Sequence, residues 1–205
     1  MGANSSLLGG YGDDLLPALK NLMPFNTASG IGSIPTAVAA YVTAAEYGDG
    51  IQHRTVLTLT SLPQSVVNGT EYQGTEIYDF PEGIIRVEGV VASIAQKTTS
   101  TLASTLNASS TGALALGSAT ASSTTLSSTM ANLLASTAFT SSATVNVAGT
   151  AVGGALAASV QLDGHTTPAK VFVNTAYATT TDVDGDATQT LSGTITITWK
   201  NLGDY

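Results

Sequence analysis

The chain has 205 residues, and Ala, Thr and Ser together make up about 40% of them. Only 10% of the residues are charged, against roughly a quarter in typical soluble domains. The net charge of -8 opposes binding to nucleic acid or anionic lipid, and the lack of cysteine excludes disulfides, thiolate nucleophiles and thiolate metal sites.

Residues 1–50 are rich in glycine and proline and predict an N-terminal arm. Within this arm, residues 13–23 predict two helical turns, because Asp13 and Asp14 stand at the N-terminal end and Pro17 fits a first turn. Residues 34–47 predict either a short helix or an extended segment. Such a short helix needs a surface to dock on, and an extended arm of about 40 residues reaches roughly 130 Å, far enough to contact a neighbouring subunit. The apolar residues that we expect to dock on another subunit or protein are Leu15, Leu16, Leu19, Leu22, Met23 and Phe25.

From residue 54 the hydrophobic pattern changes to period two, which is typical of β-strands. Strands are expected at 54–60, 76–80 and 84–95, separated by Pro63, the Asn68-Gly69 pair and the turn 81–83. In the third strand the alternation predicts Ile85, Val87 and Val91 on one face, and Arg86 and Glu88 on the other.

Residues 98–162 contain no ionisable side chain. Spaced Leu, Val and Ile residues argue against disorder and favour strands of small residues, including 141–147 and a segment around Gly153-Gly154. Leu126, Met130, Leu133 and Leu134 have helical spacing and predict one amphipathic helix of about three turns. The uncharged stretch 143–162 is long enough to span a bilayer, but its polar residues favour strands, and we expect no membrane partner.

The last third gives the clearest strands. Residues 170–178 and 191–199 both alternate, and the Asp-Gly turn within 182–186 predicts that they form a hairpin. Short strands at near-regular spacing indicate an all-β fold for residues 51–205, as an antiparallel sandwich or barrel with roughly eight strands.

Few residues form a pattern that carries chemistry. Asp182, Asp184 and Asp186 are a weak candidate for a Ca²⁺ site, although a polar hairpin turn is the favoured interpretation because the glycine spacing does not match a calcium-binding loop. His53 and His165 lack zinc-ligand spacing, so no metal or other cofactor is expected.

Acidic and aromatic residues allow two sugar-directed hypotheses. Glu76, Asp79, Glu82 and Glu88 offer paired carboxylates for glycoside hydrolysis, but on alternating strand positions they are better interpreted as a solvated face. The scattered tyrosines and Trp199 are better interpreted as core and interface residues than as a sugar-binding platform. These patterns favour a non-enzymatic protein that acts through its surface, because interfaces are depleted in Lys and Glu.

Three segments resemble virion structural proteins of tailed bacteriophages, of the capsid decoration (cement) type: 56–63, 66–83 and 192–205. The resemblance covers residues 51–205 and leaves the arm unmatched. It implies a jelly-roll-like β-sandwich on the outer surface of the capsid, as a homotrimer that bridges major capsid protein subunits.

Three alternatives stay open. A tail fibre or receptor-binding, glycan-binding module of the virion has the same β-rich, Thr-rich composition. A major capsid or tail-tube subunit would self-assemble into shells or tubes. A glycan hydrolase would lose activity when one carboxylate is changed.

Overall fold

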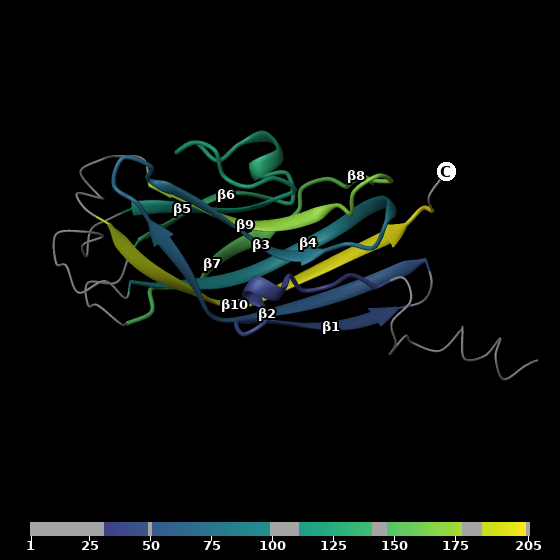
Figure 1. Cartoon of the computed structure of the whole chain (residues 1–205), viewed down its shortest axis with the longest axis horizontal. Helices are drawn as coiled ribbons and strands as arrows, with labels where there is room; N and C mark the ends of the chain where they lie inside the picture. Colours follow the sequence, from purple (N-terminus) through teal and green to yellow (C-terminus); the bar gives the residue numbers. More distant parts are fainter. Residues whose placement is uncertain (1–30, 49–50, 99–110, 141–146, 178–185, 204–205) are drawn as a thin grey trace, which may run out of the picture.

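The computed structural model describes residues 31–48, 51–98, 111–140, 147–177 and 186–203, and they form an all-β fold (Figure 1). The strands are β1 (Val42–Gly48), β2 (Gln52–Val66), β3 (Tyr72–Asp79), β4 (Gly83–Thr98), β5 (Thr111–Gly117), β6 (Leu134–Thr140), β7 (Val152–Ala155), β8 (Val160–Gly164), β9 (Lys170–Tyr177) and β10 (Ala187–Asn201). Two 3₁₀ turns, η1 (Thr36–Val38) and η2 (Ser128–Met130), are the helical elements of these described ranges.

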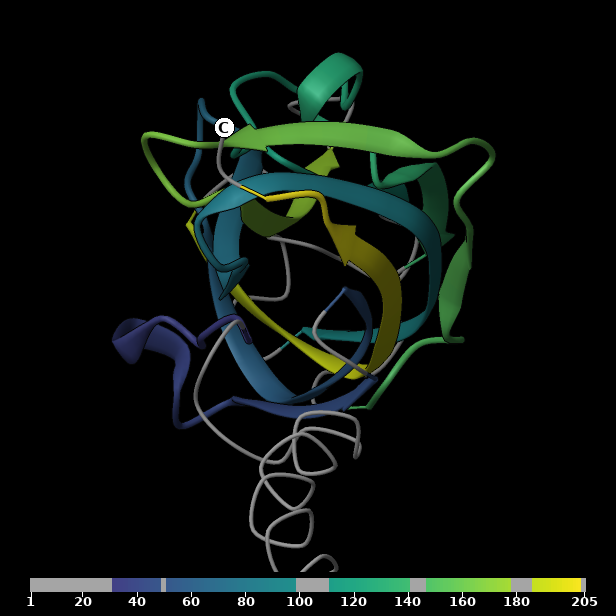
Figure 2. The ribbon, with the colours of Figure 1, turned by 90° about the vertical axis from the view of Figure 1, so that its right-hand side faces the viewer.

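The strands form two antiparallel sheets that face each other. One has six strands in the order β1-β2-β10-β4-β7, with β8 also paired to β4, and the other has four in the order β3-β9-β5-β6. Viewed along the long axis of the molecule, the strands wrap around a common interior (Figure 2). The predicted all-β sandwich is confirmed.

The strand pairs are nested along the chain. β5 pairs with β6, β4 with β7 and β8, β3 with β9, and β2 with β10, all antiparallel. The chain therefore has the connectivity of one long hairpin whose tip is the segment between β5 and β6. This hairpin is wrapped on itself so that β10 also pairs with β4, and β9 with β5.

The period-two pattern gives each sheet one apolar face, and these two faces form the core. Leu57 on β2, Ile195 on β10 and Ile94 on β4 have no exposed surface. Burying one such side chain contributes about 1.5–3 kcal/mol. Trp199 is the largest of the fully buried side chains and closes the core at the end of β10.

The predicted hairpin between residues 170–178 and 191–199 is wrong. The corresponding strands, β9 and β10, belong to different sheets, and each pairs with strands far away in sequence. Alternation shows that a segment is a strand with one buried face, but both sheets of a sandwich offer such a position. The turn proposed for Asp182 and Asp184 lies outside the described residues.

The predicted amphipathic helix is also wrong. Only the 3₁₀ turn Ser128–Met130 forms there, and Leu134 already belongs to β6. Leu126 and Leu133 are buried as expected, but in a loop and at the approach to a strand. Helical spacing was misleading because surrounding Ser and Thr side chains favour turns, and packing on the sheet supplies the burial.

Val91 lies on the opposite face from Ile85 and Val87, contrary to the predicted alternation. The register of β4 against β10 shifts between the positions facing Thr198 and Trp199. An extra residue in one strand reverses the alternation beyond it. Val91 is therefore 61% exposed, whereas Ile85 and Val87 are fully buried.

The last residues of the predicted arm are part of the sandwich. Of the segment 34–47, Thr36–Val38 form the 3₁₀ turn η1 and the residues from Val42 onward belong to β1, so the extended alternative is correct for its second part only. Before it, Ser33 makes two backbone hydrogen bonds with Asp79 of β3. Residues 31–41 thus connect the edge of one sheet to the edge of the other. Leu15, Leu16, Leu19, Leu22, Met23 and Phe25 lie outside the described residues.

Candidate interaction surface

The outward side of the six-stranded sheet carries small, uncharged side chains in register. One row across β1, β2, β10 and β4 contains hydroxyl groups, and the next contains methyl groups. The first row consists of Thr43, Thr58, Thr194 and Ser93, and the second of Ala45, Val56, Thr196 and Val91. We call these eight residues, which are all exposed or half-buried, the open face.

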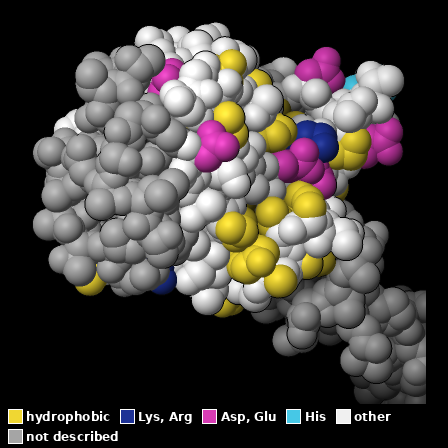
Figure 3. All heavy atoms as spheres, turned by 60° about the vertical axis from the view of Figure 1, so that its left-hand side comes forward, with side chains coloured by type: hydrophobic (Ala, Val, Ile, Leu, Met, Phe, Trp, Pro, Cys, Tyr) yellow, Lys and Arg dark blue, Asp and Glu magenta, His cyan; other side chains and the backbone are white. Residues whose placement is uncertain are grey.

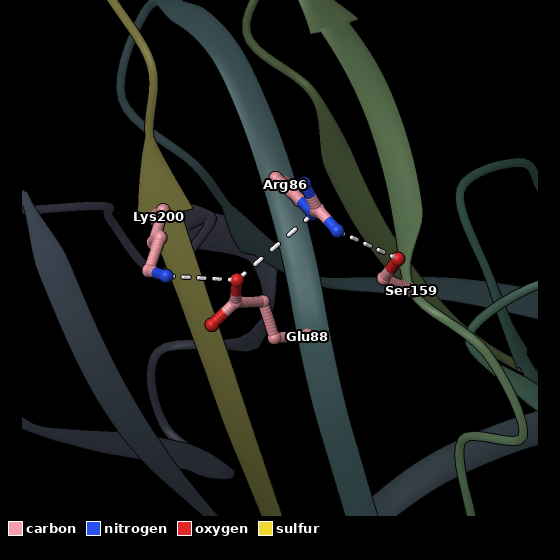
Figure 4. Close-up of polar contacts among 4 residues, drawn as sticks. All are labelled: Arg86, Glu88, Ser159 and Lys200. Carbon is pink, nitrogen blue, oxygen red and sulfur yellow. Dashed lines mark hydrogen bonds and ion pairs between the residues drawn. The ribbon is translucent and has the colours of Figure 1, made fainter.

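Charged residues gather at one end of this sheet. Glu88 Oε1 lies 2.9 Å from Lys200 Nζ and 3.9 Å from Arg86 Nε (Figure 4). Arg86 Nη2 donates a hydrogen bond to Ser159 Oγ at 3.4 Å. Because these groups are largely exposed, the pairs contribute little to stability, in the range of about 0–1 kcal/mol each. The eight residues of the open face itself carry no charge.

The outward side of the four-stranded sheet is covered by its own chain. The loop 118–133 folds over it, so that Leu126 and Ala121 pack on Ala115 and Ala176. The two sheets therefore differ: one is covered by the loop, and the other presents the open face.

Asn174 of β9 holds this loop in place. Its Oδ1 accepts a hydrogen bond from Ala121 N at 2.8 Å, and its Nδ2 donates to the carbonyl oxygens of Ala119 and Met130 at 2.9 and 2.8 Å. Its side chain is fully buried. Sequence analysis missed Asn174, since one asparagine within an alternating strand gives no signal of its own.

A buried polar network lies beneath β1. Tyr78 donates a hydrogen bond to Glu46 Oε1, and Thr55 Oγ1 donates to Glu46 Oε2 at 2.8 Å. Trp199 Nε1 donates to Thr55 Oγ1 at 2.8 Å. Burial, then the charge of Glu46, raises the pKa of Tyr78 well above its usual range. Tyr78 therefore stays a neutral donor, and the carboxylate of Glu46 is turned under the sheet.

In a second cluster, Lys170 lies close to two of the carboxylates considered in the sequence analysis, Glu76 and Asp79. Its Nζ lies 2.6 Å from Glu76 Oε2 and 3.6 Å from Asp79 Oδ1. Burial and the charge of Glu76 raise the pKa of Asp79, while Lys170 opposes this rise. Two surface hollows meet at the segment 167–170: one reaches Asn132 and Asp163, the other reaches Ser33 and Glu82.

The raised pKa of Asp79 predicts a pH-dependent effect of Asp79→Asn. Between the ordinary pKa of about 3.9 and the raised value, the folded state binds more protons than the unfolded state. The contribution of Asp79 to stability therefore falls as pH rises through this interval. We expect Asp79→Asn, compared with the wild type, to be most destabilising at acid pH and less so towards neutrality. Urea unfolding at a series of pH values measures this, and a pH-independent difference would contradict it.

The remaining sequence candidates are dispersed. His53 is buried and stacks on Trp199, with ring centroids 4.0 Å apart, whereas His165 is exposed in the loop before β9. Asp186 Oδ1 accepts a hydrogen bond from Asn68 N at 3.0 Å, and the other two aspartates of the calcium candidate lie outside the described residues. Among the described residues, no group of three His, Asp or Glu side chains is placed to hold a metal ion.

Among the described residues, the surface in Figure 3 is mostly uncharged, with small groups of charged and hydrophobic side chains. No helix in the described ranges is long and apolar enough to cross a membrane, and the end of the stretch 143–162 forms β7 and β8. Comparison with protein families, curated proteins and solved structures finds no match to this chain.

Proposed function

We propose that this protein is a non-enzymatic structural component of a virion: a decoration (cement) protein on the outer surface of a tailed-bacteriophage capsid. The observation that carries the proposal is the open face, an uncharged, regular surface that no described segment covers, whereas the loop 118–133 covers the other sheet. Surfaces depleted in Lys and Glu suit protein contacts. The sequence resemblance and the acidic net charge, which opposes contact with packaged DNA, support the outer location.

The connectivity supports a jelly roll. If β7 and β8 are counted as one interrupted strand, the eight strands from β2 to β10 lie in the orders 1-8-3-6 and 2-7-4-5. This is the order produced by wrapping a long antiparallel hairpin into two sheets, and jelly rolls of this kind occur in viral capsid proteins and in lectins. The open face is then the outer face of the sheet that contains both ends of the hairpin.

Attachment would depend on several weak contacts. With strands about 4.8 Å apart and rows about 7 Å apart, the open face covers on the order of 300 Å², below the roughly 800 Å² per partner of a standard stable interface. A homotrimer that presents three faces and three arms to the major capsid protein would gain affinity through effective concentration. The arm residues Leu15, Leu16, Leu19, Leu22, Met23 and Phe25 would supply the apolar part of each contact.

The test is cosedimentation of the purified protein with phage heads that lack it. We expect saturable binding, reduced at least tenfold by Thr58→Lys, which places a charge on the open face. Thr125→Lys, an equally exposed threonine in the loop over the other sheet, is the matched control and should bind as the wild type does. Equal binding by both variants, or no binding by the wild type, would refute the proposal. Deleting residues 1–30 tests the arm separately and should also weaken binding.

A receptor-binding module of a tail fibre is the second candidate, because lectins share this architecture and because Lys170, which lines both hollows, is paired with Glu76 and with Asp79 of the second hollow. Charged and hydroxyl-accepting groups at a hollow suit sugar hydroxyls. Binding of the isolated protein to host glycans, abolished by Glu76→Gln and unaffected by Thr58→Lys, would favour this function over the capsid proposal.

A further inference from the structure

The described strands leave one sheet edge without protection. Exposed strand edges pair readily with other chains, and proteins guard them with charges, bulges, short strands or covering segments. The edge at β3 is bridged by Ser33 and carries a register shift between Glu76 and Tyr78. β6 lies beside β7 of the other sheet, and β7 and β8 are short. β1, the remaining edge, has seven residues and no register shift.

The backbone of β1 is suited to receive another strand. Thr60 N donates a hydrogen bond to the carbonyl oxygen of Tyr41 at 2.8 Å. The backbone polar groups of Tyr41 therefore point toward β2. Since the direction alternates, the N–H and C=O groups of Thr43 and Ala45 also point toward β2. Those of Val42, Ala44 and Glu46 point away from the sheet.

The side chains of β1 provide no guard. Its single charged residue is Glu46, and the carboxylate is bonded beneath the sheet to Tyr78 and Thr55. Two large aromatic side chains lie near the ends of the strand: Tyr41, directly before it, is 37% exposed, and Tyr47, its last residue but one, is 53% exposed. They lie on the outward side of the sheet, together with the open face.

We propose that β1 pairs antiparallel with β1 of a second copy of this chain, with Ala44 opposite its own equivalent. In this register Val42, Ala44 and Glu46 supply the backbone hydrogen bonds. Each Tyr41 lies opposite Tyr47 of the other copy, and aromatic cross-strand pairs are favourable. Glu46 lies opposite Val42, so no like charges face each other. The contact is isologous, as expected for a twofold axis.

Pairing would make one continuous sheet and would join two open faces across the twofold axis. It uses only the β1 edge, so it is compatible with a trimer formed through other surfaces, and it does not depend on the capsid proposal. A single strand pair buries a small area, so we expect association in the micromolar range.

Single cysteines test the register, because the chain has none of its own. Across the twofold axis, the Cα atoms of position 44 would lie about 5.5 Å apart, within the disulfide range. Those of position 45 would be staggered by two residues and lie about 8 Å apart, too far to bridge. Under mild oxidation we expect a covalent dimer with Ala44→Cys and little or none with Ala45→Cys. Ala157→Cys, at an exposed position before β8, controls for collision.

Analytical ultracentrifugation of the protein without cysteine provides the second readout. Ala44→Lys places two ammonium groups opposite each other and should weaken self-association at least tenfold without unfolding the exposed edge. Failure of Ala44→Cys to cross-link, equal cross-linking of all three cysteine variants, or unchanged self-association of Ala44→Lys would overturn the proposal.

Discussion

Replacing Trp199 with alanine is expected to lower the free energy of unfolding by about 4 kcal/mol, as for other buried aromatic truncations. Trp199 is fully buried. Its ring stacks on His53 with centroids 4.0 Å apart and makes an edge-to-face contact with Phe80 with centroids 5.2 Å apart. Its removal leaves a cavity at the end of the core and removes the indole N–H that donates a hydrogen bond to Thr55 Oγ1. Urea unfolding followed by circular dichroism measures the loss, since the variant has no tryptophan fluorescence.

Trp199→Phe separates the two contributions. It keeps an aromatic ring in the core but lacks the indole N–H that bonds to Thr55 Oγ1. We expect Trp199→Phe to lose about 1–2 kcal/mol, no more than about half of the loss in Trp199→Ala, because of the lost hydrogen bond and the smaller ring. A loss below about 1 kcal/mol in Trp199→Ala would contradict the buried position of this side chain.

Asn174→Ala is expected to cost about 3 kcal/mol, because three hydrogen bonds to the loop 118–133 are lost and their backbone partners are left in a buried site. The loop should detach before the sandwich unfolds. Hydrogen exchange should therefore accelerate at Ala121, whose N–H bonds to Asn174 directly. Unchanged exchange in this loop would show that other contacts hold it.

Two further substitutions, Asn132→Ala and Asn174→Asp, test whether the loss in Asn174→Ala comes from the hydrogen bonds of its side chain. Asn132 bonds to Ser118 alone and is half-buried, so Asn132→Ala should cost no more than about 1 kcal/mol. Asn174→Asp keeps the acceptor for Ala121 N but turns a carboxylate towards the carbonyl oxygens of Ala119 and Met130. We expect Asn174→Asp to be more destabilising than Asn174→Ala at neutral pH and to recover at acid pH, where a protonated carboxyl group donates to one of them.

Local alternation predicted the strands because it depends only on one face being buried. The predicted strands 54–60, 76–80, 84–95, 170–178 and 191–199 coincide with β2, β3, β4, β9 and β10, although β3 ends at Asp79 and residue 178 lies outside the described residues. Four of these five strands begin earlier in the structure than predicted. The same alternation did not predict partners. β9 and β10 look like a hairpin in sequence and lie in different sheets, because either sheet would bury their apolar faces.

For the candidate interaction surface, too, the sequence predicted the composition but not the arrangement of the residues. Composition predicted a surface poor in charge, and the cluster of Glu76 and Asp79 was named among several carboxylates without its cation, Lys170. No local pattern showed that Thr43, Thr58, Thr194 and Ser93 would form one row, since they come from four strands. The exposure of Val91 depended on a shift in register between two strands, which sequence periodicity does not encode.

The sequence by itself therefore determined the all-β class, the acidic and weakly charged surface, and the lack of cysteine chemistry, because these follow from residue types and short-range periodicity. Tertiary structure alone decided which strands pair, which sheet face the loop 118–133 covers, and which face and edge remain open. These features depend on contacts between residues that are distant in the chain, such as Asn174 with Ala121 and Trp199 with Thr55, and local propensity carries no record of them.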